Sequence, residues 1–376
     1  MTLDQEEFLG NLNKSLSDYH NLSNLNSPKK RKRYFISSRV YYSLVATFDL
    51  IVFLLRVRVY SKKKLKIYYT HSTFIRGEHR NYEDVLYKEL LDKGNSVFII
   101  YNRDVFYGKI SGVKAYNFGL VVRILEVYSS LFRLKRGQGT LKEWMILNKE
   151  VTRNMVGNEI FIPSYSNDVG LSLVFNPHRE NYRLIEVQHT SVINYPPYSI
   201  ESSIKLVDVF CCRDEVSKNF VNSHIFRKLS VEYCLIESSN KVVLANNGGR
   251  KEILYISSFE FSNVHPNFIS YLIDFPSTYH IKVRLHPRQF QLRNIFYQTF
   301  TDLGCSFEFQ ETRDWFEGIS TNCIVVSILS SIVEESVGLG LKTIIVDDLG
   351  AKRFDYLIDN RLCFFSNKLV DILNIP

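Results

Sequence analysis

Proline and glycine are scarce in this chain, at nine and 17 of its 376 residues, and no internal repeat is visible. That scarcity excludes collagen-like and low-complexity classes. Hydrophobic residues make up 45% of the chain and charged residues 23%, so wholesale disorder is excluded as well. The length is sufficient for two domains of average size, each with its own hydrophobic core.

Cysteine is also infrequent, and no two cysteines form a CxxC pair. Such a pattern is typical of scattered reduced thiols and not of a disulfide scaffold, so it favours a cytoplasmic location. The six positions are Cys211, Cys212, Cys234, Cys305, Cys323 and Cys363.

Several catalytic signatures are absent. The chain has no GxxxxGK[ST] loop, no HExxH or GxSxG motif and no protein-kinase signature set. It has no Asp-x-Asp pair either. We therefore expect no dedicated divalent-metal site for a nucleotide sugar and no bound cofactor.

Positive charge is confined to one stretch. The net charge is +8, but residues 29–66 hold twelve Lys or Arg and one acid, Asp49, a local charge of +11 that leaves −3 for the rest. The folded body is therefore not basic, and nucleic acid is not an expected partner.

An apolar segment of 16 residues, 40–55, lies inside this basic stretch and contains Asp49. Because a membrane-spanning helix needs about 20 apolar residues, a span is disfavoured. Two interpretations remain equally supported: an interfacial helix on an anionic membrane surface, and a buried first helix with solvated charged flanks. The polar residues 1–28 before it are expected to form a mobile arm.

From residue 65 onward, short apolar runs typical of buried parallel strands alternate with helical patterns. This alternation predicts an α/β fold of two Rossmann-like domains facing a cleft, with the N-terminal basic and apolar stretch as a helical extension. The polar stretch 237–250 is the natural linker. We expect the domains to cover 1–60 (arm and membrane-associating segment), 61–240 and 241–376.

Three motifs fall at predicted strand ends, where ligands of such sheets bind. The first is RLHPR, Arg284–Arg288. Arg284 and Arg288 are suited to bidentate hydrogen bonds with a phosphate, and His286 is a titratable donor. The alternative is a solvated His-Pro turn with surface arginines.

The second motif is SILSS, Ser327–Ser331, followed by an acidic helix. Ser331 and Glu334 have the spacing of a capping box, which predicts that a helix begins here. A helix N-terminus with the hydroxyls of Ser330 and Ser331 is also suited to bind an anion.

The third motif is EVQHT, Glu186–Thr190. His189 is a candidate general base for a hydroxyl nucleophile. Glu186 lies three residues earlier, an odd offset that directs it to the other face of the strand. The simpler alternative for His189 is a structural histidine whose ring donates a hydrogen bond to a loop carbonyl.

Taken together, RLHPR, SILSS and the following LKTIIVDD resemble the C-terminal half of bacterial GT-B-fold transferases. The His-Pro and Ser-Ser pair resembles that of bacterial sialyltransferases and of the CDP-glycerol glycerophosphotransferases of teichoic acid synthesis. EVQHT is similar to the QHG or WHG segment of the latter and of capsule and O-antigen transferases, with Thr190 in place of the usual glycine. The resemblance covers about 65–348, with some fifteen specific matches.

The resemblance implies that 61–240 is the acceptor domain and 241–376 the nucleotide-donor domain, and it implies roles for these residues. His286, with Arg284 or Arg288, would contact the donor phosphate, and Ser330, Ser331 and Glu334 belong to the same donor-binding segment. His189 would deprotonate the acceptor hydroxyl. In a sialyltransferase-like variant the base would be a carboxylate instead, Glu186 or Asp168.

The implied function is a metal-independent, inverting glycosyltransferase or glycerophosphotransferase-like enzyme. It would use a nucleotide-activated donor, CMP- or CDP-linked, to extend a capsule, O-antigen or teichoic-acid-like polysaccharide. Its acceptor would be a polysaccharide or a lipid-linked glycan. The enzyme would be cytoplasmic and peripherally associated with the inner face of the plasma membrane. The alternatives are a catalytically degenerate homologue that binds nucleotide or glycan, and a nucleotide-sugar epimerase or hydrolase.

Overall fold

The computed structural model describes most of the chain, and the account below concerns only this part: residues 2–23, 47–48, 50–56, 65–70, 96–101, 109–110, 113–118, 121–122, 139–188, 192–193, 195–212, 215–224, 230–235, 244, 251–258, 261–274, 279–311, 316 and 318–366. The chain divides into two compact units. Unit 1 comprises residues 1–12, 31–192 and 199–239, and unit 2 comprises residues 13–30, 193–198 and 240–376.

Unit 1 contains a sheet with the strand order β3-β4-β2-β1-β5-β6-β7-β8. Every neighbouring pair is parallel except β3 and β4. The strands are β1 (Leu65–Thr70), β2 (Ser96–Tyr101), β3 (Lys109–Ile110), β4 (Val113–Asn117), β5 (Asn158–Ile162), β6 (Tyr182–Val187), β7 (Val209–Cys212) and β8 (Glu232–Leu235). The helical elements of the same stretch are α6 (Gly139–Thr152), α7 (Asp168–Val174), η2 (Arg179–Asn181), η3 (Pro196–Ser199) and α8 (Glu215–His224).

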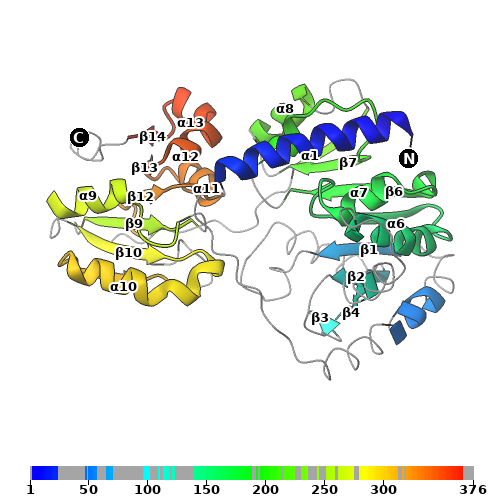
Figure 1. The fold of residues 1–376 in the computed structure, drawn as a ribbon, viewed down its shortest axis with the longest axis horizontal. Coiled ribbons are helices and arrows are strands. Elements are labelled where there is room, and N and C mark those ends of the chain that lie inside the picture. Colours follow the sequence, from blue (N-terminus) through cyan, green and yellow to red (C-terminus); the bar gives the residue numbers. More distant parts are fainter. Residues whose placement is uncertain are drawn as a thin grey trace. The chain divides into compact units, whose positions relative to one another are not determined.

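Unit 2 contains an all-parallel sheet with the order β11-β10-β9-β12-β13-β14. Its strands are β9 (Glu252–Ile256), β10 (His280–Arg284), β11 (Phe307–Phe309), β12 (Ile324–Ser327), β13 (Thr343–Ile345) and β14 (Phe364–Phe365). Its helical elements are α9 (Pro266–Asp274), η4 (Pro287–Leu292), α10 (Arg293–Asp302), α11 (Ile332–Gly338), α12 (Asp348–Arg353) and α13 (Asp355–Asp359). Figure 1 shows these strands and helices in yellow to red.

The strand order identifies both units as doubly wound. Counted within unit 2, the strands run 3-2-1-4-5-6, and the seven strands of unit 1 other than β3 follow the same order with one more strand at the end. This is the Rossmann arrangement, in which the chain reverses its direction of growth beside the first strand. The predicted fold class of two Rossmann-like α/β units is therefore confirmed.

The core of unit 2 explains why its strands are nearly continuous apolar runs. On β9, Ile253 and Tyr255 pack with residues of α9 and α10, whereas Leu254 and Ile256 pack on the opposite face near α11. Successive side chains of a strand point to opposite faces, so helices on both faces require apolar residues at every position. All five residues of β9 are buried.

The first helix differs from the prediction of a mobile arm. Residues Leu3–Ser23 form helix α1. Phe8, Leu9 and Leu12 on one side of it are at most 6% exposed, and the Phe8 ring lies 6.4 Å from that of Tyr165. Their spacing of three to four residues places them on one helix face, and Phe8 packs this face on Tyr165 of unit 1, to which residues 1–12 belong.

The apolar segment within the basic stretch is helical at residues 47–48 and 50–56. Phe53 is fully buried and makes edge-on ring contacts with Phe98, Tyr116 and Phe118. One face of this segment is thus packed, as the interpretation of a buried helix requires. Among the described residues, no helix is both long enough and apolar enough to cross a membrane.

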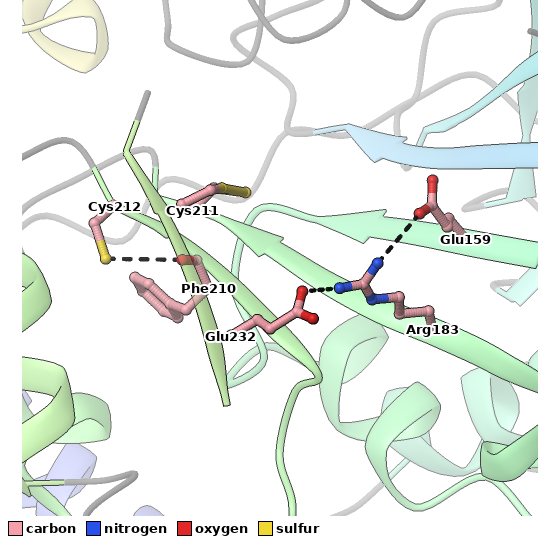
Figure 2. Close-up of a disulfide and its surroundings, with 7 residues drawn as sticks. Glu159, Arg183, Phe210, Cys211, Cys212 and Glu232 are labelled. Atoms are coloured by element: carbon pink, nitrogen blue, oxygen red, sulfur yellow. Dashed lines mark hydrogen bonds and ion pairs between the residues drawn. A yellow bond between two sulfur atoms is a disulfide. The ribbon is translucent and has the colours of Figure 1, made fainter. Parts of the chain in front are cut away.

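Two of the six cysteines are paired, which corrects the expectation of scattered reduced thiols. Cys211 on β7 and Cys234 on β8 are register partners across two parallel strands and form a disulfide, with a Cα–Cα distance of 4.6 Å. Figure 2 shows this bond beside Phe210 and the buried Cys212. The two positions are 23 residues apart, so only the pairing of the strands brings them together.

We expect this pairing to be visible in solution. When the unreduced protein is unfolded and treated with iodoacetamide, four cysteines should be alkylated, and all six after reduction, because four are free. Intact-mass measurement counts the adducts. The Cys234→Ser variant should give five adducts without reductant. Six adducts in the unreduced wild-type protein would contradict the pairing.

Candidate functional site

The carboxyl edge of the unit 2 sheet is the place to look for a site. The strand order reverses between β9 and β12, and in doubly wound sheets ligands bind outside the carboxyl ends of the strands at this point. Ser257 and Ser258 follow β9, and Ser327 ends β12. The neighbouring strand β10 ends at Arg284, directly before His286. Two of the three predicted motifs therefore meet at one edge.

The RLHPR motif adopts the turn that was predicted after a strand. Arg284 and His286 are half-buried, and the backbone N–H of His286 donates to Ser257 Oγ at 2.8 Å. The backbone of Arg288 lies in η4, and its side chain is outside the described residues.

The SILSS motif also follows a strand and precedes a helix, but its detailed geometry differs from the prediction. Ser331 precedes α11 with φ −60° and ψ −18° and makes no side-chain capping hydrogen bond, so the interpretation as a capping box is wrong. Ser330 Oγ accepts from the backbone N–H of Ile332 at 3.3 Å. The carboxylate of Glu334 accepts a hydrogen bond from the hydroxyl of Tyr356 on α13. A side-chain cap at Ser331 would need an extended backbone there, and the chain has already entered the helical region.

A buried hydroxyl stands out in this segment. Ser327 is fully buried, and its Oγ has no hydrogen-bond partner among the residues that the structure describes. The backbone carbonyl of Ser327 accepts from Val346 N–H at 3.2 Å, which extends the pairing of β12 with β13 to the same edge. Buried polar atoms are nearly always paired, so an orphaned hydroxyl at this edge is unusual.

A histidine–aspartate pair at the same edge escaped the sequence analysis. His265 Nε2 lies 3.3 Å from Asp347 Oδ2, and Asp347 Oδ1 accepts from the backbone N–H of Leu349 at 2.8 Å at the start of α12. Burial raises the pKa of Asp347, but the hydrogen bonds from His265 and Leu349 outweigh it and hold the pKa below its usual value. An aspartate directly after the predicted strand 342–346 is a helix-start signal that could have identified this position.

The third motif lies in unit 1 and is described only in part. Glu186 on β6 is fully buried, and its Oε2 accepts from the backbone N–H of Tyr165 at 3.0 Å. Asp168 is exposed at the start of α7. His189 and Thr190 lie outside the described residues. The role of His189 as a base therefore stays a prediction.

Unit 1 also has a hollow of about 780 Å³ at the opposite, amino edge of its sheet. Charged side chains line it in matched pairs: Lys66 with Glu159 at 2.6 Å, Lys205 with Asp208 at 2.8 Å, and Arg183 with Glu232. The last pair is drawn in Figure 2. These ion pairs form a row along the starts of the strands. Because they are partly solvated, each contributes little to stability.

No family model matches the chain, and no curated protein matches it. Among solved structures, the chain is similar to MurG of Acinetobacter baumannii, with 10% identity, coverage of 80% of this chain and 84% of that one, and a TM-score of 0.46. It is similar to the lipopolysaccharide outer core galactosyltransferase WaaB, with 8% identity, coverage of 75% and 80%, and a TM-score of 0.45. It is also similar to the UDP-GlcNAc 2-epimerase of Neisseria meningitidis, with 13% identity, coverage of 76% and 82%, and a TM-score of 0.42.

Proposed function

We propose that this protein is a metal-independent, inverting glycosyltransferase that uses a nucleotide-activated donor to extend a bacterial surface polysaccharide. The observation that carries the proposal is the position of Arg284, His286 and Ser327–Ser331. They lie at the carboxyl ends of β10 and β12, the two strands on either side of β9. Strands are spaced by about 4.8 Å, so the two segments are about 10 Å apart, which a diphosphate is able to bridge.

In the proposed reaction the acceptor hydroxyl attacks the anomeric carbon of the donor, and the bond from that carbon to the phosphate oxygen breaks. The electron pair of this bond stays on the nucleotide phosphate. Arg284 and His286 would stabilise the charge that develops there, a contribution that is often the largest in catalysis. The proton of the acceptor hydroxyl would pass to His189, with Glu186 or Asp168 as the carboxylate alternatives.

Glu186 is the weaker of the two carboxylate candidates. It is fully buried and already accepts a backbone hydrogen bond, whereas a base must reach the acceptor hydroxyl. Asp168 is exposed, so it is the carboxylate more accessible to a hydroxyl if His189 is not the base.

A thermal-shift screen tests the donor site. We expect one of CMP, CDP, UDP, GDP and dTDP to stabilise the protein without added metal, since a ligand at 100 times its Kd adds about 2.7 kcal/mol to the free energy of unfolding. The shift should be strongly reduced in His286→Ala. If no nucleotide shifts the Tm of the folded protein, the donor-site proposal fails.

A separate assay distinguishes the alternatives. A protein that binds nucleotide but turns over no donor would be a degenerate homologue, which the threonine at position 190 motivates. Turnover without any acceptor would indicate an epimerase or hydrolase. The proposed transferase requires an acceptor.

We also propose that unit 1 binds the anionic surface of the membrane that carries the acceptor. Phe48, Ile51 and Leu55 are spaced by three and four residues, so they share one helix face, and they are 66%, 52% and 56% exposed. Phe53 is directed into the core. The stretch 29–66, which contains this helix, holds twelve Lys or Arg. Each cation near an anionic leaflet contributes about 1 kcal/mol to binding.

Replacing Phe48, Ile51 and Leu55 together by serine should lower binding to phosphatidylglycerol-containing vesicles at least about tenfold, because the apolar insertion is lost. Vesicle sedimentation measures this. The variant keeps Phe53, so it preserves the core contact that a deletion of residues 1–60 would remove. Ile146→Ser, at a position 51% exposed on α6, is the control and should bind normally. Equal sedimentation of the triple variant and the wild type would contradict membrane binding through this face.

A further inference from the structure

We propose that Gln289, together with Ser257, is a positioning pair that fixes the backbone of His286 for donor binding. This inference rests on the proposed function. Neither residue belongs to the motifs, and neither would touch the donor. Both are nearly inaccessible, with exposures of 1% and 2%.

The hydrogen bonds converge on His286 from both sides. Its backbone N–H donates to Ser257 Oγ at 2.8 Å, and its carbonyl accepts from the backbone N–H of Gln289 at 2.7 Å. The Ser257 hydroxyl in turn donates to Gln289 Oε1 at 2.5 Å. Both backbone polar groups of His286 are thereby held by one buried pair of residues, the N–H by the Ser257 side chain and the carbonyl by the backbone of Gln289.

The other end of the Gln289 amide is anchored in the loop after β9. Nε2 donates to the carbonyl of Ser258 at 2.7 Å and also to the carbonyl of Phe261. Two carbonyl acceptors require the NH₂ group on that side, so the carbonyl of the amide must face Ser257. One side chain therefore joins the loop after β9 to the turn after β10.

Glutamine is the residue that this arrangement demands. The site needs one acceptor and two donors on a planar group, and a glutamate would set a negative charge against two carbonyl oxygens. An apolar side chain would remove all three hydrogen bonds of the amide, the one from Ser257 Oγ and those to the carbonyls of Ser258 and Phe261. The loop after β9 would then no longer be tied to the turn that carries His286 through this side chain, and the turn would be less rigidly held.

A function in positioning is distinguishable from a function in stability alone. If Gln289 acts through His286, then Gln289→Met should weaken nucleotide binding in the wild-type background and add nothing in a His286→Ala background, since coupled residues are not additive. If it only stabilises the loop, its effect should persist in both backgrounds.

The test is a double-mutant cycle on the full chain, read by calorimetric titration with the nucleotide that shifts the Tm most. We expect Gln289→Met to raise the Kd at least about tenfold in the wild-type background. The coupling free energy between positions 289 and 286 should nearly equal the whole effect of Gln289→Met. Gln291→Met, at an exposed position in the same turn, is the matched control and should leave the Kd unchanged. An unchanged Kd in Gln289→Met, or an equal effect in both backgrounds, would overturn the inference.

Amide hydrogen exchange provides a readout that does not depend on any nucleotide. Exchange at the His286 N–H should accelerate at least about tenfold in Gln289→Met and in Ser257→Ala, and not in Gln291→Met. If Gln289→Met fails to fold, Ser257→Ala replaces it in the cycle. Faster exchange in a protein that binds no nucleotide would refute the proposed function and leave the positioning of the turn intact. Unchanged exchange in a nucleotide-binding protein would refute the positioning pair.

Discussion

Turnover by the His286→Ala variant is expected to fall at least about 100-fold, the usual scale for loss of one acid–base or electrostatic group. His286 follows β10 at the carboxyl edge of the unit 2 sheet, where a phosphate would be held. The alanine variant keeps both backbone hydrogen bonds of residue 286, because neither uses the imidazole. The loss should therefore appear in turnover and nucleotide affinity, with little change in Tm.

The same strand supplies a matched control. His280 begins β10 at the opposite edge, with Nδ1 3.0 Å from Ser306 Oγ and Nε2 3.6 Å from Glu308 Oε1. His280→Ala removes an identical side chain far from the proposed donor site. We expect its turnover to stay within about twofold of the wild type, because such surface contacts contribute little. Near-normal turnover in His286→Ala, or an equal loss in both variants, would refute the assigned role.

Gly350→Ala is expected to lower the free energy of unfolding by about 1–3 kcal/mol, the cost of overpacking a filled site. A Cβ at this position in α12 would lie 1.9 Å from the carbonyl oxygen of Ile328 and 2.8 Å from Cγ2 of Ile345. The first contact is with backbone, so relief requires movement of α12 or of the SILSS segment. We therefore expect the nucleotide-induced shift in Tm to shrink as well.

Gly338→Ala separates this steric effect from helix propensity. Gly338 ends α11, and a Cβ there would meet nothing within 4 Å. Alanine is the better helix former by about 1 kcal/mol, so this variant should be as stable as the wild type or slightly more stable. Chemical denaturation of both variants measures the difference. If Gly350→Ala were as stable as Gly338→Ala, α12 would not be packed closely on the segment after β12, and this prediction would be refuted.

The α/β class of this protein was predictable because it depends on local pattern. In parallel sheets covered on both faces, strands are short and almost entirely apolar, as at β9 and β12. The same pattern marks where each strand ends, so it located Arg284, His286 and Ser327–Ser331 at the carboxyl edge of a sheet. The helical patterns between them imply parallel strands with crossovers.

The prediction of a mobile arm was wrong for residues 3–23, for a different reason. Helix α1 has low average hydrophobicity, but Phe8, Leu9 and Leu12 are enough to bury one face against unit 1. Composition alone indicates a solvated segment. Only the presence of a receptive surface, which includes Tyr165, decides that three apolar side chains suffice.

The sequence by itself determined the two Rossmann-like units and the strand ends at which polar motifs accumulate. The periodicity of apolar residues and the turn-forming residues between them act over only a few positions. The tertiary structure alone decided the lateral order of the strands, the pairing of Cys211 with Cys234, and the bonds of Gln289 to residues 28–32 positions earlier in the chain. It also decided that Ser331 makes no cap, since its backbone is already helical. These features depend on contacts between distant segments, which local spacing does not encode.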